Sequence, residues 1–327
     1  MGVIDTLSAG FALINRRPWL MVIPVILDVL LWLGPVVSVA PLVDRLPDAW
    51  YDAATSLSNQ GLESSVSREE LGQARDEIRS YTEQLGQVNL LSLLALQMPS
   101  LMTGSAVSSP LGAGVQLSMD SLALVLLVVA ALSFGSLLIA SLFLAGIGIY
   151  VRGDAFRLRL YLRRSLINWG RLILLYVIVL IALAVLGMPV AMIAILASAL
   201  SKTFGGLILG LLLAAMLWAA LYLFYSLAAM FVGDVNPVLA LWHSFNIVRY
   251  NLGPAMGLAV LVVIIGQGIG IALRFVLGNP LLVSAAIIGN AYVGAGLAAA
   301  AMIFYRERYA IWQKKVRSGK QVVEMTK

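Results

Sequence analysis

Asp28 is the residue of this chain whose position most suggests chemistry, because it is the only acidic residue within a predicted membrane-crossing helix. An ionisable group in hydrocarbon costs at least about 2.5–3.5 kcal/mol on insertion scales, and such residues often bind protons, ions or solutes. At 1.5 Å per residue, Asp28, Tyr222, Gln267 and Asn290 all fall roughly 15–22 Å from the inner membrane edge. They could form a midplane polar site, or they could be structural groups that hydrogen-bond within a packed bundle.

Other kinds of chemistry lack the residues that they need. The chain contains no cysteine, which excludes disulfides and cysteine-ligated zinc or iron–sulfur sites. Its single histidine, His243, excludes a histidine-cluster metal site, and no membrane-embedded serine has a base at matching depth. Gly266, Gly268 and Gly270 have the spacing of a dinucleotide loop, but no strand precedes them, so helix packing is favoured. We therefore predict no metal, no cofactor and no enzymatic activity.

The elements that would position these residues are membrane-spanning helices. Apolar residues make up 61 % of the chain and charged residues 12 %, against roughly 45–50 % and 25 % in soluble domains. Several stretches without a charged residue exceed the ~20 residues that a helix needs to cross a bilayer, and their continuous apolar character excludes a barrel. The predicted fold class is an all-α polytopic membrane protein with six transmembrane helices, at residues 19–40, 122–151, 172–200, 205–232, 255–278 and 281–305.

The Lys and Arg residues orient the chain in the membrane. Sixteen of the 22 lie before the first span, between the second and third, between the fourth and fifth, or after the sixth. Because short cytoplasmic loops are rich in Lys and Arg, both termini are expected in the cytoplasm. The expected location is the cytoplasmic (inner) membrane of a prokaryote, with residues 306–327 as a basic cytoplasmic tail.

Residues 41–121 are expected to form a mostly helical extracytoplasmic domain between the first two spans. Ser67 and Glu70 have the spacing of a capping box, which predicts a polar helix that runs to about Leu85. The apolar stretch 90–96 is too short to span, and should lie on the membrane surface or cover the helix bundle. Residues 103–119, rich in Gly, Ser and Ala, are typical of a linker.

Three cytoplasmic segments, residues 1–18, 152–171 and 233–254, lead into spans with the same pattern. Each combines a short amphipathic helix with Asn, Arg, Trp, Gly or Pro at the expected bend. Apolar side chains can face the acyl chains while Arg reaches the phosphates and a helix breaker turns the chain into the membrane. Contacts with anionic lipid headgroups are expected from Arg16, Arg17, Arg163, Arg164, Arg171 and Arg249.

The third of these segments also matches a known pattern. Residues 240–251 fit A-L-x-x-S-x-x-x-V-R-x-N through Ala240, Leu241, Ser244, Val248, Arg249 and Asn251. The segment resembles a loose group of six-helix bacterial membrane proteins, which includes the membrane region of some glycerophosphodiester phosphodiesterases. The resemblance implies a six-helix fold and no activity, because the phosphodiesterase chemistry of that group resides in a separate soluble domain.

Two classes of function remain open from the residues. The lack of catalytic residues and the lipid-facing segments favour a non-enzymatic scaffold, accessory subunit or membrane-organising factor. Its expected partners are a bilayer with anionic headgroups and another membrane protein, without nucleic acid. The alternative is a transporter or channel for a small solute or ion at the midplane polar site, although matching halves show no pair of clearly broken helices.

Overall fold

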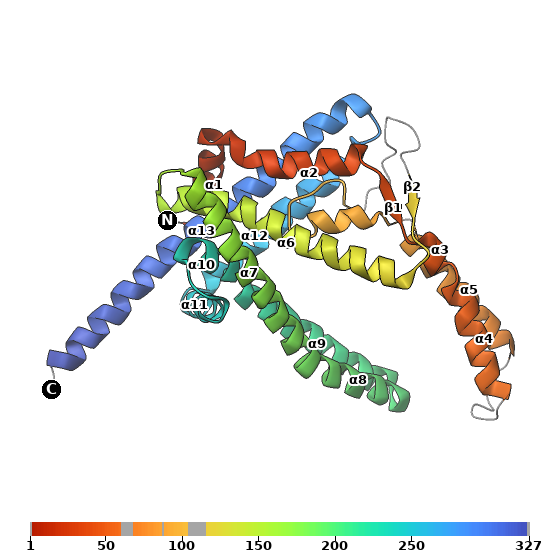
Figure 1. The fold of residues 1–327 in the computed structure, drawn as a ribbon. Coiled ribbons are helices and arrows are strands. Elements are labelled where there is room, and N and C mark those ends of the chain that lie inside the picture. The colour runs from red at the N-terminus through yellow and green to blue at the C-terminus, as the bar shows by residue number, and fades with distance from the viewer. Residues whose placement is uncertain (1, 60–67, 87, 104–115, 326–327) are drawn as a thin grey trace. The chain divides into compact units, whose positions relative to one another are not determined.

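The computed structural model describes residues 2–59, 68–86, 88–103 and 116–325, and its ribbon is drawn in Figure 1. The chain divides into two compact units. One contains residues Met1–Ile23, Leu137–Phe275 and Ile288–Lys327, and the other contains Pro24–Ser136 and Val276–Ile287. Three helices, α2 (Val22–Leu33), α6 (Leu122–Arg152) and α13 (Pro280–Met325), contribute residues to both units.

The first unit is built only from helices in its described part. In chain order they are α1 (Val3–Arg16), η1 (Pro18–Met21), the second half of α6 (Leu122–Arg152), α7 (Leu158–Ala182), the π-helical turn η3 (Leu183–Gly187), α8 (Met188–Leu200), α9 (Lys202–Leu223), α10 (Ser226–Gly233), α11 (Pro237–Tyr250), α12 (Leu252–Arg274) and most of α13 (Pro280–Met325). The predicted basic tail after residue 305 continues α13 as a helix to Met325.

Five helices of the described chain are long and apolar enough to cross a membrane. They cover Leu122–Arg152, Leu158–Ser198, Lys202–Gly233, Leu252–Arg274 and Leu282–Lys314. The predicted all-α, multi-pass membrane architecture is confirmed at this level. In the first four helices, at most 11 % of the residues in the most apolar 18-residue stretch (the window) are buried within the protein. In Leu282–Lys314, 61 % of these residues are buried. The part of α13 within that window is therefore a central element, and the other spans expose apolar side chains that require hydrocarbon around them.

The first predicted span is shorter than expected. The 4 residues of η1 and the 12 of α2 (Val22–Leu33) give a helical rod of about 24 Å, less than the ~30 Å hydrocarbon core. Gly34 and Pro35 end the helix before residue 40, since the residue before a proline is disfavoured in the α conformation. Five of the six predicted spans thus correspond to the long helices, and the first corresponds to a short apolar helix, Pro18–Leu33.

The three segments that lead into spans differ in their bends. Helix α1 ends at Arg16 before the turn at Arg17, and Asn251, with φ −136° and ψ 41°, separates α11 from α12. The middle segment has no such bend, because α7 passes through Gly170 without interruption. The predicted interface helix at 152–171 is therefore joined to its span as one rod. The distortion comes later, at η3, directly before Met188 and Pro189 at the start of α8.

Helix α1 packs closely against α13. A Cβ on Gly10 would lie 2.5 Å from the carbonyl oxygen of Gly296 and 2.7 Å from the nitrogen of Ala300, so only glycine permits this approach. Phe11 extends the contact, with its ring centroid 5.4 Å from that of Tyr292. The small residues of α13 thus bring an amphipathic helix close to its backbone.

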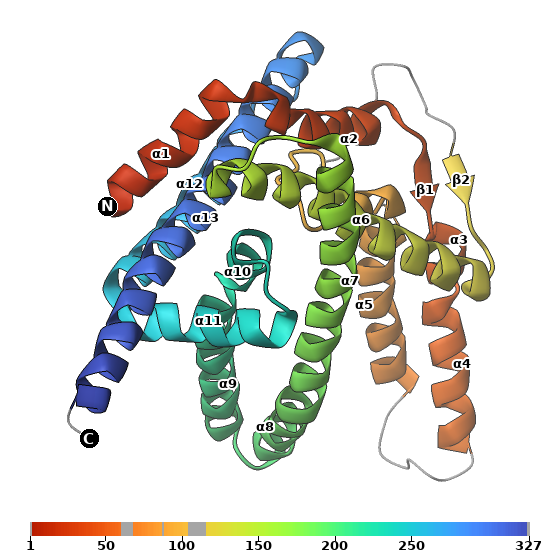
Figure 2. The same cartoon turned by 60° about the vertical axis from the view of Figure 1, so that its left-hand side comes forward.

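Helices α8 and α9 form an antiparallel hairpin, seen side by side in Figure 2. Gly205 allows the tight approach at its closed end, where an added Cβ would lie 2.7 Å from the Cα of Ser198. Ala194 and Ala197 are buried along the hairpin, while the large side chains around them are exposed.

The second unit contains most of α2, two short strands, three further α-helices and a 3-10 helix, with parts of α6 and α13. Its elements are β1 (Val36–Ser38), α3 (Ala40–Val43), α4 (Leu46–Asn59), α5 (Arg68–Gly86), the 3-10 helix η2 (Leu90–Ala95) and β2 (Gln116–Ser118), followed by the first half of α6. The polar helix predicted to run to about Leu85 is confirmed as α5; Ser67 lies outside the described residues.

Part of the predicted linker 103–119 is instead a strand. Gln116–Ser118 pairs in parallel with Val36–Ser38, with Val37 opposite Leu117; residues 104–115 lie outside the described chain. The side chain of Asn89 holds β1 in place, since its Oδ1 accepts from the amide of Val37 at 3.0 Å and its Nδ2 donates to the carbonyl of Pro35. Strand pairing satisfies backbone groups next to an apolar cluster that includes Val37, Val39, Val43 and Leu90.

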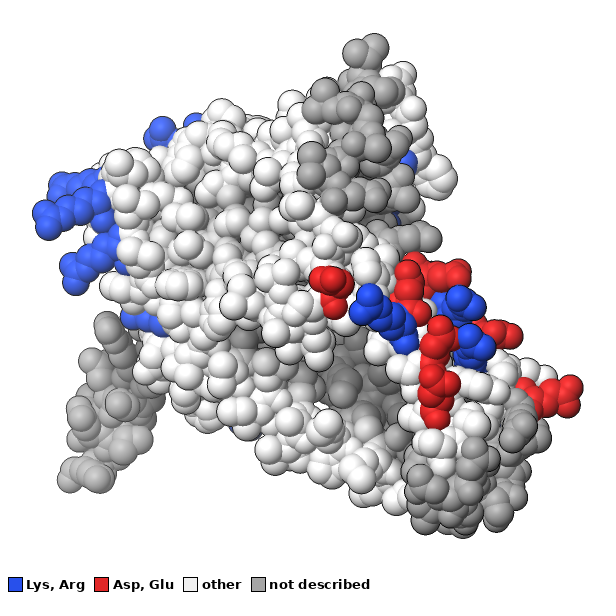
Figure 3. Space-filling view, turned by 45° about the vertical axis from the view of Figure 1, so that its right-hand side comes forward, with Lys and Arg blue, Asp and Glu red and all other residues white. Residues whose placement is uncertain are grey.

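Helices α4 and α5 carry most of the charge in this unit. In Figure 3 acidic and basic side chains are interspersed over this part of the surface, while most of the described surface in the view is uncharged. Arg75 pairs with Asp48 across the hairpin and also lies 5.4 Å from the ring centroid of Tyr51. These groups are partly exposed, so the pairs contribute little to stability and keep the hairpin compatible with water.

Candidate functional site

Asp28 is completely buried in the second unit, on the same face of α2 as Pro24 and Leu27. Its carboxylate accepts hydrogen bonds from the Ser100 hydroxyl, from the Leu101 amide at 3.0 and 3.2 Å, and from the Met102 amide at 3.4 Å. The donors belong to a segment without helix or strand, in which Leu101 and Met102 are themselves buried. Asp28 therefore anchors a buried irregular segment by satisfying its amides, which is a structural role.

The other members of the predicted midplane site lie in the first unit and share no hydrogen bond with one another among the described residues. The carbonyl of Tyr222 accepts from the Ser244 hydroxyl, and its ring lies 5.0 Å from that of Phe245. Gln267 is exposed on α12, and the side-chain amide nitrogen of Asn290 is buried without a partner among the described residues. Tyr222 is accounted for by packing, while a binding role for Gln267 and Asn290 stays a prediction.

Two of the arginines predicted at lipid headgroups, Arg164 and Arg171, form ion pairs within the chain. Arg164 of α7 donates to Asp154 at 2.6 Å, and Arg152 at the end of α6 lies 3.2 Å from the same carboxylate. The hydrogen bond from Arg164 and the neighbouring positive charges hold the pKa of Asp154 below its usual value. The α6–α7 loop is thereby tied to the helix that follows it.

Arg171, two turns further along α7, binds the end of α10. Its guanidinium donates to Asp234 at 2.5 Å and to Asn168 at 3.0 Å. Asp234 occupies the left-handed region at φ 50° and ends α10, so Arg171 also places a positive charge at a helix C-terminus. One face of α7 therefore fastens the ends of two apolar helices, because Arg164 and Arg171 are seven residues apart.

Sequence reasoning missed both acidic partners, although the chain contains a signal for them. Arg152-Gly153-Asp154 and Val232-Gly233-Asp234 place the same Gly-Asp pair at the end of the second and fourth predicted spans. Gly153 has φ 82° and Asp234 has φ 50°, so each pair turns the chain through the left-handed region. A lone acid in an otherwise basic loop could have been interpreted as an ion-pair partner.

The remaining predicted headgroup residues present their side chains outward. Arg16, Arg163 and Arg249 are exposed, and Arg249 lies 6.0 Å from the ring centroid of Tyr250. Arg17 is also exposed and lies 5.0 Å from the ring centroid of Tyr150. These four arginines have the exposure that headgroup contact requires.

His243 lies in an aromatic cluster with residues of α13. Its Nδ1 is 3.2 Å from the hydroxyl of Tyr305, and its ring centroid lies 4.8 Å from Tyr309 and 5.8 Å from Trp312. Burial of the imidazole among these rings lowers its pKa from the ordinary value of 6.5, because desolvation disfavours the charged form. The cluster joins α11 to α13, which is a structural role.

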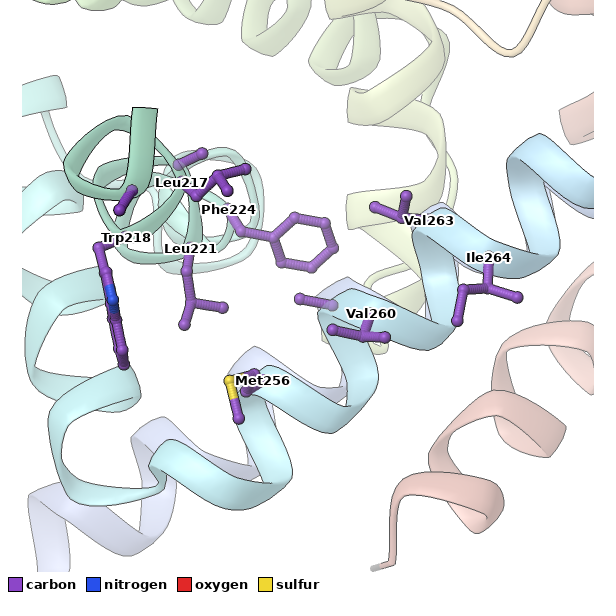
Figure 4. A pocket seen from close by; sticks show the side chains of 11 residues that line it. Leu217, Trp218, Leu221, Phe224, Met256, Val260, Val263 and Ile264 are labelled. Atoms are coloured by element: carbon purple, nitrogen blue, oxygen red, sulfur yellow. The ribbon is translucent and has the colours of Figure 1, made fainter. Parts of the chain in front are cut away.

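A groove of about 540 Å³ lies between α9 and α12 (Figure 4). Leu217, Leu221 and Phe224 line it from α9, and Met256, Val260 and Val263 line it from α12. The lining residues are all apolar, except for the indole nitrogen of Trp218. Its volume is typical of ligand sites, which occupy ~300–1,000 Å³, but those sites also place polar groups that this lining lacks.

Comparison of the chain with protein-family models, with curated proteins and with solved structures finds no match.

Replacement of Asp28 should destabilise the protein. We expect Asp28→Asn to lower the free energy of unfolding by about 1–3 kcal/mol, because Nδ2 in place of Oδ2 turns a donor toward the Leu101 amide and the remaining bonds lose a charged acceptor. Ser100→Ala should have a smaller effect, since both amides stay bound. Thermal unfolding in detergent measures both, with the exposed Asp44→Asn as control. Equal midpoints for Asp28→Asn and Asp44→Asn would contradict the anchoring role.

Stability should depend on pH through His243. Because its folded-state pKa is lowered, neutral His243 favours the folded state; this contribution is complete above about pH 6.5 and decreases as pH falls through the folded-state pKa. The melting temperature should therefore decrease as the pH is lowered below about 6.5. His243→Gln should flatten this dependence of the melting temperature on pH between about pH 5 and 7. Since His243 is the single histidine, no other imidazole contributes; an unchanged profile in His243→Gln would refute this assignment.

Proposed function

We propose that this chain is a non-enzymatic membrane protein that acts as a scaffold or accessory subunit and contacts other membrane components through its exposed apolar helices. The observation that carries the proposal is the α8–α9 hairpin. Leu196 is 69 % exposed on α8 and Leu211 is 71 % exposed on α9, although both helices consist largely of apolar residues. None of the most apolar window of Lys202–Gly233 is buried within the chain.

The environment of the hairpin follows from the physics of membranes. Lipid tails and apolar side chains are equally good solvents for Leu, so such a face is stable against lipid or against another helix. Small residues favour the second case because they let backbones approach, and Gly206 and Gly210 on α9 have open space around them. A hairpin that contacts little of its own chain is therefore suited to binding a neighbouring membrane protein.

The contacts of Asp28 also support a scaffold more than a transporter. A coupling residue for protons or ions must change partners during turnover, whereas the Asp28 carboxylate is held by two backbone amides and a hydroxyl. The transport alternative then rests on Gln267 and Asn290, which the described hydrogen bonds do not join to each other.

The proposed location is the cytoplasmic membrane of a prokaryote, with both termini in the cytoplasm. An even number of spans is necessary for this topology, so the short helix Pro18–Leu33 must cross together with the five long ones. A hydrophobic segment shorter than the bilayer can cross when the bilayer thins locally or flanking residues extend to the interface, at a modest cost. Arg16 and Arg17 at its start are suited to that role.

Cysteine labelling tests this topology, since the chain has no native cysteine. We expect Ile4→Cys and Gln313→Cys, both at exposed positions near the termini, to react with a membrane-impermeant thiol reagent only after the cells are permeabilised. Tyr81→Cys in α5 should react in intact cells. Reaction of Ile4→Cys in intact cells would place the N-terminus outside and leave five spans.

Photo-crosslinking in cells tests the scaffold. We expect a photoreactive residue in place of Leu211 or Leu196 to give a discrete protein adduct, because these side chains project from the hairpin. The same residue in place of Ala194, which is buried in the hairpin, should give none. Adducts with lipid alone at Leu196 and Leu211 would contradict the scaffold role.

A further inference from the structure

The groove between α9 and α12 is a site whose chemistry indicates a particular occupant. Its walls belong to two helices that can cross a membrane, and Leu217, Val260 and Val263 are 73 %, 48 % and 56 % exposed within it. Figure 4 shows side chains of α9 and α12 that border the same space. In a bilayer this space fills with hydrocarbon, because water has no polar partner in such a lining.

The size of the groove suits an acyl chain. Lining residues extend from Ala214 on α9 to Phe224 directly after it, and from Met256 to Ile264 on α12, which correspond to about 12–15 Å along each helix. The groove of about 540 Å³ can hold a hydrocarbon chain of that length.

Helix α11 supplies a polar end to the groove. The ring of Phe245 lies 5.0 Å from Tyr222 of α9, while the hydroxyl of Tyr225 donates to the carbonyl of Ala255 at the start of α12. Arg249 follows Phe245 by four residues and therefore shares its face of α11, one turn nearer to α12. Its side chain is exposed, so a positive charge is available where α11 meets α12, seven residues before Met256, the first lining residue of α12.

Aromatic residues mark the same end as a membrane interface. The rings of Trp218 and Tyr222 are tilted toward each other with centroids 6.4 Å apart, and the ring centroid of Trp242 lies 6.0 Å from that of Phe245. Trp and Tyr are enriched at the headgroup level of bilayers, where Arg also meets phosphate. An apolar groove that ends at aromatic rings and an arginine is complementary to an anionic phospholipid. Its apolar residues suit the acyl chain, and the arginine suits the negatively charged headgroup.

We propose that the α9–α12 groove binds one acyl chain of an anionic phospholipid, whose phosphate contacts Arg249. This site goes beyond the scaffold role, since it does not depend on a protein partner. It also differs from bulk solvation of the helices, because the groove accepts one chain in a defined place and should be saturable.

The first test fills the groove. Native mass spectrometry of the full chain in detergent, titrated with phosphatidylglycerol, should show one bound lipid that saturates. Ala220→Trp places an indole in the groove and should weaken this binding at least tenfold, whereas Ala219→Trp on the adjacent, non-lining position should leave it unchanged. Both alanines are exposed on α9, which makes the pair matched. Equal loss in both variants, or no saturable binding by the unmodified chain, would overturn the proposal.

The second test concerns the headgroup. Arg249→Gln should weaken phosphatidylglycerol binding about fivefold, as expected for one basic residue at an anionic surface. Its effect on zwitterionic phosphatidylcholine should be smaller, because the choline group offsets the charge of the phosphate. Arg79→Gln, at an exposed arginine on α5, is the control and should bind normally. Equal affinity of the unmodified chain for the two lipids would overturn the anionic assignment. If the unmodified chain forms a dimer that Ala220→Trp dissociates, the lipid assignment is wrong and the occupant of the groove is a second copy of the chain.

Discussion

Satisfaction of backbone hydrogen-bonding groups away from water is the constraint on which the rest of this structure depends. Within the long apolar helices each amide is bonded in its own segment, which permits side chains to be apolar on every face. The difficulty is confined to the places where a helix ends or the chain is irregular. At those places the few polar side chains are concentrated.

The ends of several helices show how this constraint is met. The Ser244 hydroxyl donates to the carbonyl of Tyr222 near the end of α9, and the Arg306 guanidinium donates to the carbonyl of Val151 near the end of α6. Asp28 satisfies backbone donors rather than acceptors, because its carboxylate accepts hydrogen bonds from the amides of a buried irregular segment. A buried acid that suggests transport chemistry from its position is thereby explained by the backbone around it.

Polar side chains bound at helix ends leave the lateral surfaces of the spans apolar. The exposed surface of the α8–α9 hairpin and the α9–α12 groove are two consequences of this distribution. Both are formed by apolar side chains, which need no hydrogen-bond partner. The arginines divide in the same way. Arg164 and Arg171 bind acids at helix ends, while Arg249 remains exposed where a headgroup can reach it.

The sequence by itself determined the membrane class and the approximate position of five spans, because long runs without charge are a local property that hydrocarbon alone makes stable. It also predicted helix α5 and the break between the spans at 255–278 and 281–305, because the residues that begin or end a helix act within a few positions. Only the tertiary structure decided the partners of Asp28, Arg164 and Arg171, which lie 72, 10 and 63 residues away in the chain. The pairing of Gln116–Ser118 with Val36–Ser38 and the fit of Gly10 against α13 belong to the same class. Such contacts depend on where distant backbones meet, and side-chain type at one position carries no information about that distance.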